Sequence, residues 1–212
     1  MSTHIANEFN NTQTECYIYY EKAFDISRGI SENLSYIIIE IAFLRVYLAW
    51  EYFLQSIFIY CCTKGAHKVR SYIKFPSEKE ATDFLNQMEG SRGYTDWCTP
   101  DRIIDRANVC FAGGQPFNDV ICCYKNQLQW MKKVRNKIAH NSLLAQKDFM
   151  DLMKGITGSV PEDITPGKFL AGRAPKTMLG TEHESASPTV YQLWNTILNY
   201  ASKEIYLLTQ DK

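Results

Sequence analysis

The chain has 212 residues, 45% of them hydrophobic and 13% aromatic, which is enough apolar material for a buried core and excludes a disordered chain. Its 23 basic and 23 acidic residues cancel. This balance excludes a generally basic coat for nucleic acid, so that any anionic partner must be held by a local cluster.

Residues 1–14 are polar and are predicted to form a flexible tail. They contain neither a basic n-region nor an apolar h-region, so no secretory signal is expected and the protein is predicted to be cytoplasmic. The seven cysteines are odd in number and form no C-x-x-C pair. We interpret them as reduced cysteines in a helical core, and we expect no zinc site and no cofactor.

The apolar pattern predicts a first helix from Cys16 to about Arg28, and one long helix, or two in succession, over 33–63. The stretch 36–62 is long enough to cross a bilayer. Four polar or charged residues interrupt it, namely Glu40, Arg45, Glu51 and Gln55. Because charges inside a membrane are costly, we predict a largely buried helix of an all-α protein and no membrane contact.

Residues 64–116 are predicted to be an irregular insert with short helices. Ser77 and Glu80 form a capping box that predicts a helix over 78–89, and Thr99–Pro100 opens another. Three basic residues in this insert are interpreted as surface residues rather than ligands, namely His67, Arg102 and Arg106.

A regular apolar face predicts one helix over 117–140, followed by a further short helix. Residues 155–187 are rich in glycine and proline and are predicted to form a long loop, after which Ser187–Pro188 caps a last helix. Neither repeats nor strand alternation are recognisable. The expected fold is an all-α bundle of four to five main helices with short extra helices, in a single domain over 1–212.

A basic cluster lies near the end of the helix predicted over 117–140, in the stretch QWMKKVRNKIAHNS. Asn136 and His140 are four residues apart and share one face of a helix, whereas Arg135 and His140 lie about 140° apart on an ideal helix. They can line one cleft if the helix end is unwound, or if a second copy supplies half of the site. Three lysines of the cluster are predicted to bind RNA, namely Lys132, Lys133 and Lys137.

These residue types suit cleavage of RNA without a metal. A histidine transfers protons at neutral pH, and an arginine offers a planar, permanently charged fork to phosphate oxygens. An asparagine can orient an oxygen or a histidine. RNA is the expected substrate, because its 2′-OH can attack the adjacent phosphorus and DNA lacks that nucleophile.

At these residues the chain resembles the HEPN family. RNKIAH, residues 135–140, is similar to the R-x(4–6)-H motif of that family in its common form Arg-Asn-x-x-x-His. LAWEYFLQSIF, residues 48–58, resembles the second core helix of the RiboL-PSP-like HEPN group. The order of elements agrees over about residues 16–154, and more loosely over the last helix.

The resemblance implies a helical bundle that dimerises around a shared cleft. It also implies a metal-independent endoribonuclease that leaves 2′,3′-cyclic phosphate and 5′-OH ends, typical of toxin–antitoxin and antiphage systems. Carried over by position, the catalytic set is Arg135 and His140, with Asn136 as its polar support. Glu51 is expected to hold the Arg135 fork, although an ion pair of Glu51 with Arg45 or a lysine is an equal alternative.

An antitoxin or a defence-system sensor protein is the partner that the resemblance implies, besides RNA and a second copy. HEPN toxins that are silenced by a nucleotidyltransferase often carry His-x-Tyr, but here Ser142 follows Asn141, and neutralisation by that route loses support. Two alternatives stay open. One is a catalytically inactive HEPN-like binding or dimerisation module, and the other is an unrelated helical protein whose basic helix end is stabilised by the helix dipole.

Overall fold

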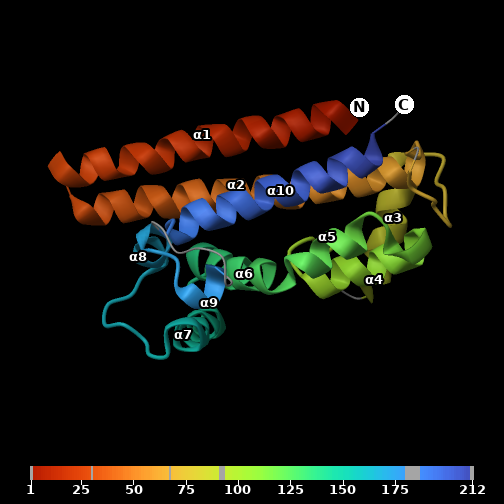
Figure 1. Ribbon diagram of the computed structural model, residues 1–212. Coiled ribbons are helices and arrows are strands. Elements are labelled where there is room, and N and C mark those ends of the chain that lie inside the picture. Colours follow the sequence, from red (N-terminus) through yellow and green to blue (C-terminus); the bar gives the residue numbers. More distant parts are fainter. Residues whose placement is uncertain (1, 30, 67, 91–93, 180–186, 211–212) are drawn as a thin grey trace. The chain divides into compact units, whose positions relative to one another are not determined.

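The computed structural model describes residues 2–29, 31–66, 68–90, 94–179 and 187–210, and these residues form an all-helical structure (Figure 1). The predicted all-α fold class is confirmed. The helices are α1 Ser2–Gly29, α2 Glu32–Thr63, α3 Glu78–Met88, α4 Pro100–Cys110, α5 Phe117–Cys123, α6 Lys125–Ala139, α7 Leu143–Thr157, α8 Pro166–Ala171, α9 Lys176–Leu179 and α10 Val190–Thr209.

The chain divides into two compact units. The first comprises Met1–Asn10, Ala49–Gln129 and Leu198–Lys212, and the second comprises Asn11–Leu48 and Trp130–Ile197. Four helices, α1, α2, α6 and α10, contribute to both units. The single HEPN-like domain over 1–212 stays a prediction.

The N-terminal segment is helical, and the predicted flexible tail over 1–14 is wrong. Helix α1 begins at Ser2, and Phe9, which is 2% exposed, packs on the rings of Trp50 and Phe53 with centroid distances of 6.1 and 5.5 Å. The buried positions of α1 recur alternately at three and four residues, which is the spacing of one helix face: Ala6, Phe9, Gln13, Cys16, Tyr20 and Ala23. The polar residues between them conceal this face in the sequence.

Phe58 of α2 is at the centre of the aromatic core of the first unit. Its ring lies 5.3 Å from Trp97, 4.8 Å from Phe111 and 4.8 Å from Phe117. The three partners precede α4, follow α4 and begin α5, so this one side chain of α2 contacts the segments on both sides of α4 and the start of α5. Figure 1 shows α4 and α5 beside the C-terminal part of α2. Such ring contacts favour stability beyond the apolar area that they bury.

The short helices of the insert begin where the sequence predicts. The Ser77 hydroxyl accepts from the Glu80 amide at 3.2 Å, which confirms the N-terminal cap of α3, and α4 begins at Pro100. Of the cysteines, four are buried, namely Cys16, Cys61, Cys62 and Cys110. Cys122 and Cys123 are exposed, so their placement in the core was wrong.

A buried ion cluster joins the α3 end to α4. Arg106, only 2% exposed, pairs with the buried carboxylate of Glu89 and donates to the carbonyl of Asp96, and its guanidinium lies 4.6 Å from the Trp97 ring. Arg102 also pairs with Glu89 and is half-buried. The interpretation of Arg106 as a surface residue is therefore wrong, and His67 lies outside the described residues.

We expect Arg106→Met to destabilise the protein by about 3–5 kcal/mol, because it removes one partner of a buried ion pair. Arg45→Met is the matched control, since Arg45 pairs with Glu15 on the surface, and such pairs contribute at most about 1 kcal/mol. Urea denaturation measures both. Equal effects of the two substitutions would contradict this account.

The second unit has its own aromatic core. Tyr20 of α1 stacks on Tyr191 of α10 with the centroids 4.2 Å apart and the planes within 3°. Trp194 of α10 contacts Phe43 of α2 at 5.4 Å and Phe169 of α8 at 5.7 Å. The core of this unit therefore joins α1, α2, α8 and α10.

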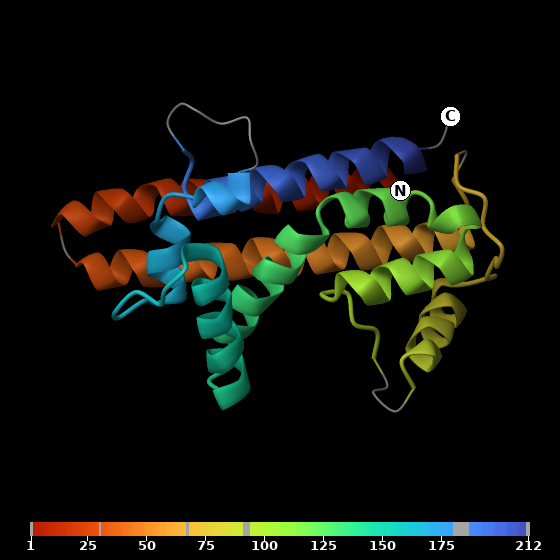
Figure 2. The same cartoon turned by 60° about the horizontal axis from the view of Figure 1, so that its bottom comes forward.

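The predicted loop over 155–187 is partly wrong. Helix α7 continues to Thr157, and α8 and α9 lie within the range, while residues 180–186 lie outside the described part. In both views α8 lies against the N-terminal half of α2 (Figures 1 and 2). The last helix is capped by Thr189, not by Ser187–Pro188, because the Thr189 hydroxyl accepts from the Gln192 amide and the Gln192 side chain accepts from the Thr189 amide.

Helix α2 is a single helix of 32 residues. Within the described part of the chain, none of the helices combines the length and the apolarity that a membrane crossing requires.

Candidate functional site

The helix predicted over 117–140 is two helices. Helix α5 ends at Cys123, Tyr124 has a non-helical backbone (φ −104°, ψ 13°), and α6 begins at Lys125. Apolar residues keep the same helical spacing across the break, so periodicity alone cannot reveal it. The basic cluster therefore lies on a separate helix, α6, most of which belongs to the second unit.

Arg135 and Asn136 contact each other at the C-terminal end of α6. Both are half-buried, and the Arg135 Nη1 donates to the Asn136 Oδ1 at 3.2 Å. The acceptor fixes one arm of the guanidinium fork. The structure thus brings these two predicted site residues into contact, while a supporting role of Asn136 in catalysis stays a prediction.

His140 is the first residue after α6 and is exposed. Its backbone amide donates to the Asn136 carbonyl at 2.9 Å, so its backbone completes the last helical turn. The side chain of His140 is therefore exposed to solvent just past the last turn of α6.

Two lysines extend the polar face of α6 toward its end. Lys133, Asn136, Lys137 and His140 are spaced i, i+3, i+4 and i+7 and thus follow one face. Lys132 lies on the adjoining face beside Arg135. All three lysines are half-buried, which is typical of stems that pack on apolar neighbours while the amines reach water.

Glu51 is half-buried on α2 and belongs to the first unit, whereas Arg135 belongs to the second. A pairing of Glu51 with Arg135 stays a prediction. Arg45, the alternative partner, forms an ion pair with Glu15 of α1 at 2.9 Å.

Glu40 has a role that the sequence analysis missed. Its Oε1 accepts from the Gly167 amide at 2.7 Å and so ties the first turn of α8 to α2. A Cβ on Gly167 would lie 2.6 Å from the Tyr36 carbonyl oxygen, so only glycine permits this approach. In the sequence, Glu40 was only an interruption of an apolar stretch, and nothing there indicated its distant partner.

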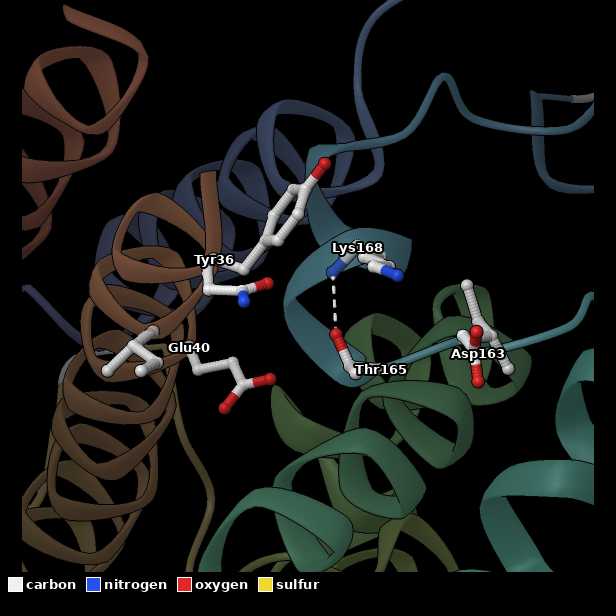
Figure 3. Close-up of a pocket in the computed structure, with 8 residues that line it drawn as sticks. Tyr36, Glu40, Asp163, Thr165 and Lys168 are labelled. Carbon is white, nitrogen blue, oxygen red and sulfur yellow. Dashed lines mark hydrogen bonds between the residues drawn. The ribbon is translucent and has the colours of Figure 1, made fainter. Parts of the chain in front are cut away.

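A cleft of about 650 Å³ opens between α2 and the segment that leads into α8. Figure 3 shows Tyr36 and Glu40 projecting from α2, with Thr165 and Lys168 on the α8 side and Asp163 in the preceding loop. The full lining is Asn33, Tyr36, Ile37, Glu40, Asp163, Ile164, Thr165 and Lys168.

The electrostatics of Glu40 link this cleft to α6. Burial raises the pKa of the Glu40 carboxyl above its ordinary value of 4.5, while the Gly167 amide and the charge of Lys137 act in the opposite direction. Lys137 is part of the basic face of α6, so the cleft and the basic face are electrostatic neighbours within one unit.

Among the residues that the structure describes, no group of three histidine, cysteine, aspartate or glutamate side chains is placed to hold a metal ion. Comparison of the chain with protein-family models, curated proteins and solved structures gives no match. The resemblance to the HEPN family therefore rests on residues 48–58 and 135–140, and membership of the family stays a proposal.

We expect Gly167→Ala to destabilise the protein by about 1–3 kcal/mol, because the new methyl group overlaps the Tyr36 backbone. Gly155→Ala is the matched control. Gly155 lies inside α7 with nothing within 4 Å of an added Cβ, so alanine there should stabilise by about 0.5–1 kcal/mol. Urea denaturation compares the two, and an equal change in both would contradict the close contact of α8 with α2.

The raised pKa of Glu40 predicts how its contribution to stability depends on pH. The folded protein holds the Glu40 proton more tightly than the unfolded chain does. The stability contributed by this group is therefore fully present below about pH 4.5 and is lost as the pH rises through the raised folded value.

Accordingly, the unfolding free energy of wild type minus that of Glu40→Gln should fall as the pH increases across this window. Denaturant titrations at several pH values measure the difference. Asn33→Ala, at a non-titrating position of the same cleft, should show a difference from wild type that is constant with pH. A constant difference for Glu40→Gln as well would rule out the raised pKa.

Proposed function

We propose that this protein is a HEPN-type, metal-independent endoribonuclease that acts as a homodimer. The observation that carries the proposal is the Arg135–Asn136 hydrogen bond at 3.2 Å, with the exposed His140 on the same helix end. This set combines an oriented cationic fork for a phosphate with a proton-transfer group that a substrate can reach.

The cleavage uses the RNA's own 2′-OH as the nucleophile. His140 removes the proton of the 2′-OH, the 2′ oxygen bonds to phosphorus, and the bond from phosphorus to the 5′ oxygen breaks. Arg135 binds the non-bridging oxygens as charge builds on them. A second histidine returns a proton to the leaving 5′ oxygen, so that the products are a 2′,3′-cyclic phosphate and a 5′-OH end.

The need for a second proton donor favours a dimer, in which the partner supplies its own copy of His140. Apolar surface beside the motif agrees with an interface there. Leu143 and Leu144, at the start of α7, are 92% and 68% exposed, and exposed apolar side chains of this size commonly mark contact surfaces.

RNA would be held locally, because the net charge of the chain is zero. Lys132, Lys133 and Lys137 are the cations nearest to the motif in the sequence, and contacts of lysine with phosphate position a strand without reading its bases. A toxin or antiphage effector, controlled by an antitoxin or a sensor protein, is the biological role that this activity fits.

The second candidate function is a catalytically inactive binding or dimerisation module. The same exposed pair, Leu143 and Leu144, favours it, since a docking surface beside α6 would serve a partner equally well without any chemistry.

We expect the wild-type protein to cleave single-stranded RNA in the presence of EDTA and to leave cyclic phosphate ends. His140→Ala and Arg135→Ala should each reduce the rate by about a hundredfold or more, because each removes a group that acts on the reacting atoms. Arg135→Lys should restore little of it, since lysine keeps the charge and loses the fork. Gel analysis of a labelled RNA measures all three.

His4→Ala is the matched control, because His4 is an exposed histidine on α1 outside the motif, and this variant should cleave as wild type does. Growth arrest on expression, abolished by His140→Ala, gives a second readout. A dimer in analytical ultracentrifugation that cleaves no RNA would instead favour the binding module.

A further inference from the structure

The cleft between α2 and the α8 segment combines apolar walls with a polar rim. Ile37 and Ile164 line it from different elements, one from α2 and the other from the residue stretch before α8. The rim carries both signs of charge, with the carboxylates of Glu40 and Asp163 and the amine of Lys168. A flat ligand with apolar faces, hydrogen-bonding edges and an attached anion fits such a slot.

We propose that this cleft binds a guanine nucleotide of the RNA strand, with Glu40 and Asp163 receiving the base and Lys168 its phosphate. This inference rests on the proposed function for the identity of the strand. Sequence-specific proteins commonly read single-stranded RNA by splaying a base out and bonding its Watson–Crick edge.

Guanine is favoured because the cleft offers more acceptors than donors. Its Watson–Crick edge carries two adjacent donors, N1–H and the exocyclic amine, which match the two oxygens of a carboxylate. Glu40 uses only its Oε1 for the Gly167 amide, and each carboxylate oxygen can accept more than one hydrogen bond. Adenine, cytosine and uracil each present a ring or carbonyl acceptor toward the same carboxylate, which is unfavourable.

An arginine side chain is also flat and rich in hydrogen-bond donors, so it is the main alternative ligand for the cleft. The positive charge of Lys168 favours the nucleotide over the arginine. The residue follows Gly167 on α8 and lines the same cleft as Glu40, so the cleft contains one amine beside its two carboxylates. Lys137 adds a second positive charge to the field at Glu40. Two cations disfavour an arginine and favour a ligand with a phosphate.

The proposal is tested by isothermal titration of the full-length chain with the four nucleoside 3′-monophosphates and with N-acetylarginine amide. Guanosine 3′-monophosphate should bind about tenfold or more tightly than the other three, as a bidentate base contact allows. Glu40→Gln should remove the preference, because one acceptor becomes a donor. Lys168→Ala should weaken the binding of all four nucleotides by a similar factor, because it removes the contact with the phosphate, and should leave the preference for guanine unchanged.

Glu162→Gln is the matched control: this exposed residue precedes Asp163 and does not line the cleft, so guanine preference should persist. Equal binding of the four nucleotides, no binding of any, or preferred binding of the arginine amide would each overturn the proposal. The two proposals can be distinguished by experiment. Guanine preference without RNA cleavage in EDTA would overturn only the proposed nuclease activity. RNA cleavage without guanine preference would overturn only the proposed binding of guanine in the cleft.

Discussion

The close contact of α8 with α2 is the constraint on which the second unit depends. It requires a residue without a side chain at Gly167, and it places the half-buried carboxylate of Glu40 against the first turn of α8. Phe169 follows on α8 and packs on Trp194 of α10. One glycine and one carboxylate thus position the wall of a cleft and part of the core at the same time.

The basic end of α6 and this cleft belong to one electrostatic system. Lys137 lies on the polar face of α6, and its positive charge lowers the pKa of the Glu40 carboxyl. A change of charge on this face of α6 therefore changes the pKa of a group that lines the cleft. The proposed cleavage uses Arg135 and His140, and the proposed base recognition uses Glu40, Asp163 and Lys168. The two proposals therefore involve different residues of the same unit.

Buried polar groups in both units are held by specific partners. Arg106 is enclosed by Glu89, the Asp96 carbonyl and Trp97, and Gln13 of α1 donates to the Asn195 carbonyl at 2.7 Å. Desolvation is costly for such groups unless they are paired, so they fix how the helices pack rather than add much to stability.

Local patterns in the sequence determined the elements that depend on neighbouring residues. The Ser77–Glu80 capping box, Pro100 at a helix start and the apolar face of α2 are encoded within a few turns, and the structure has a helix at each. The basic motif that contains Arg135 and Asn136 is likewise a short continuous stretch, although the hydrogen bond between these two side chains was not predicted. The polar residues around Phe9 obscured the buried face of α1, so the helical N-terminus was not predicted. The apolar spacing continues across Tyr124, so the break between α5 and α6 was not predicted either.

Only the tertiary structure decided what depends on distant partners. Glu40 and Gly167 are 127 residues apart, and neither carries a local signal for the bond between them. The burial of Arg106 likewise follows from Glu89 and Trp97, which packing brings together. The sequence determined the capped helices and the basic motif because these need only neighbours in the chain, whereas the burial of the N-terminal part of α1 and the cleft required the fold to bring separate segments together.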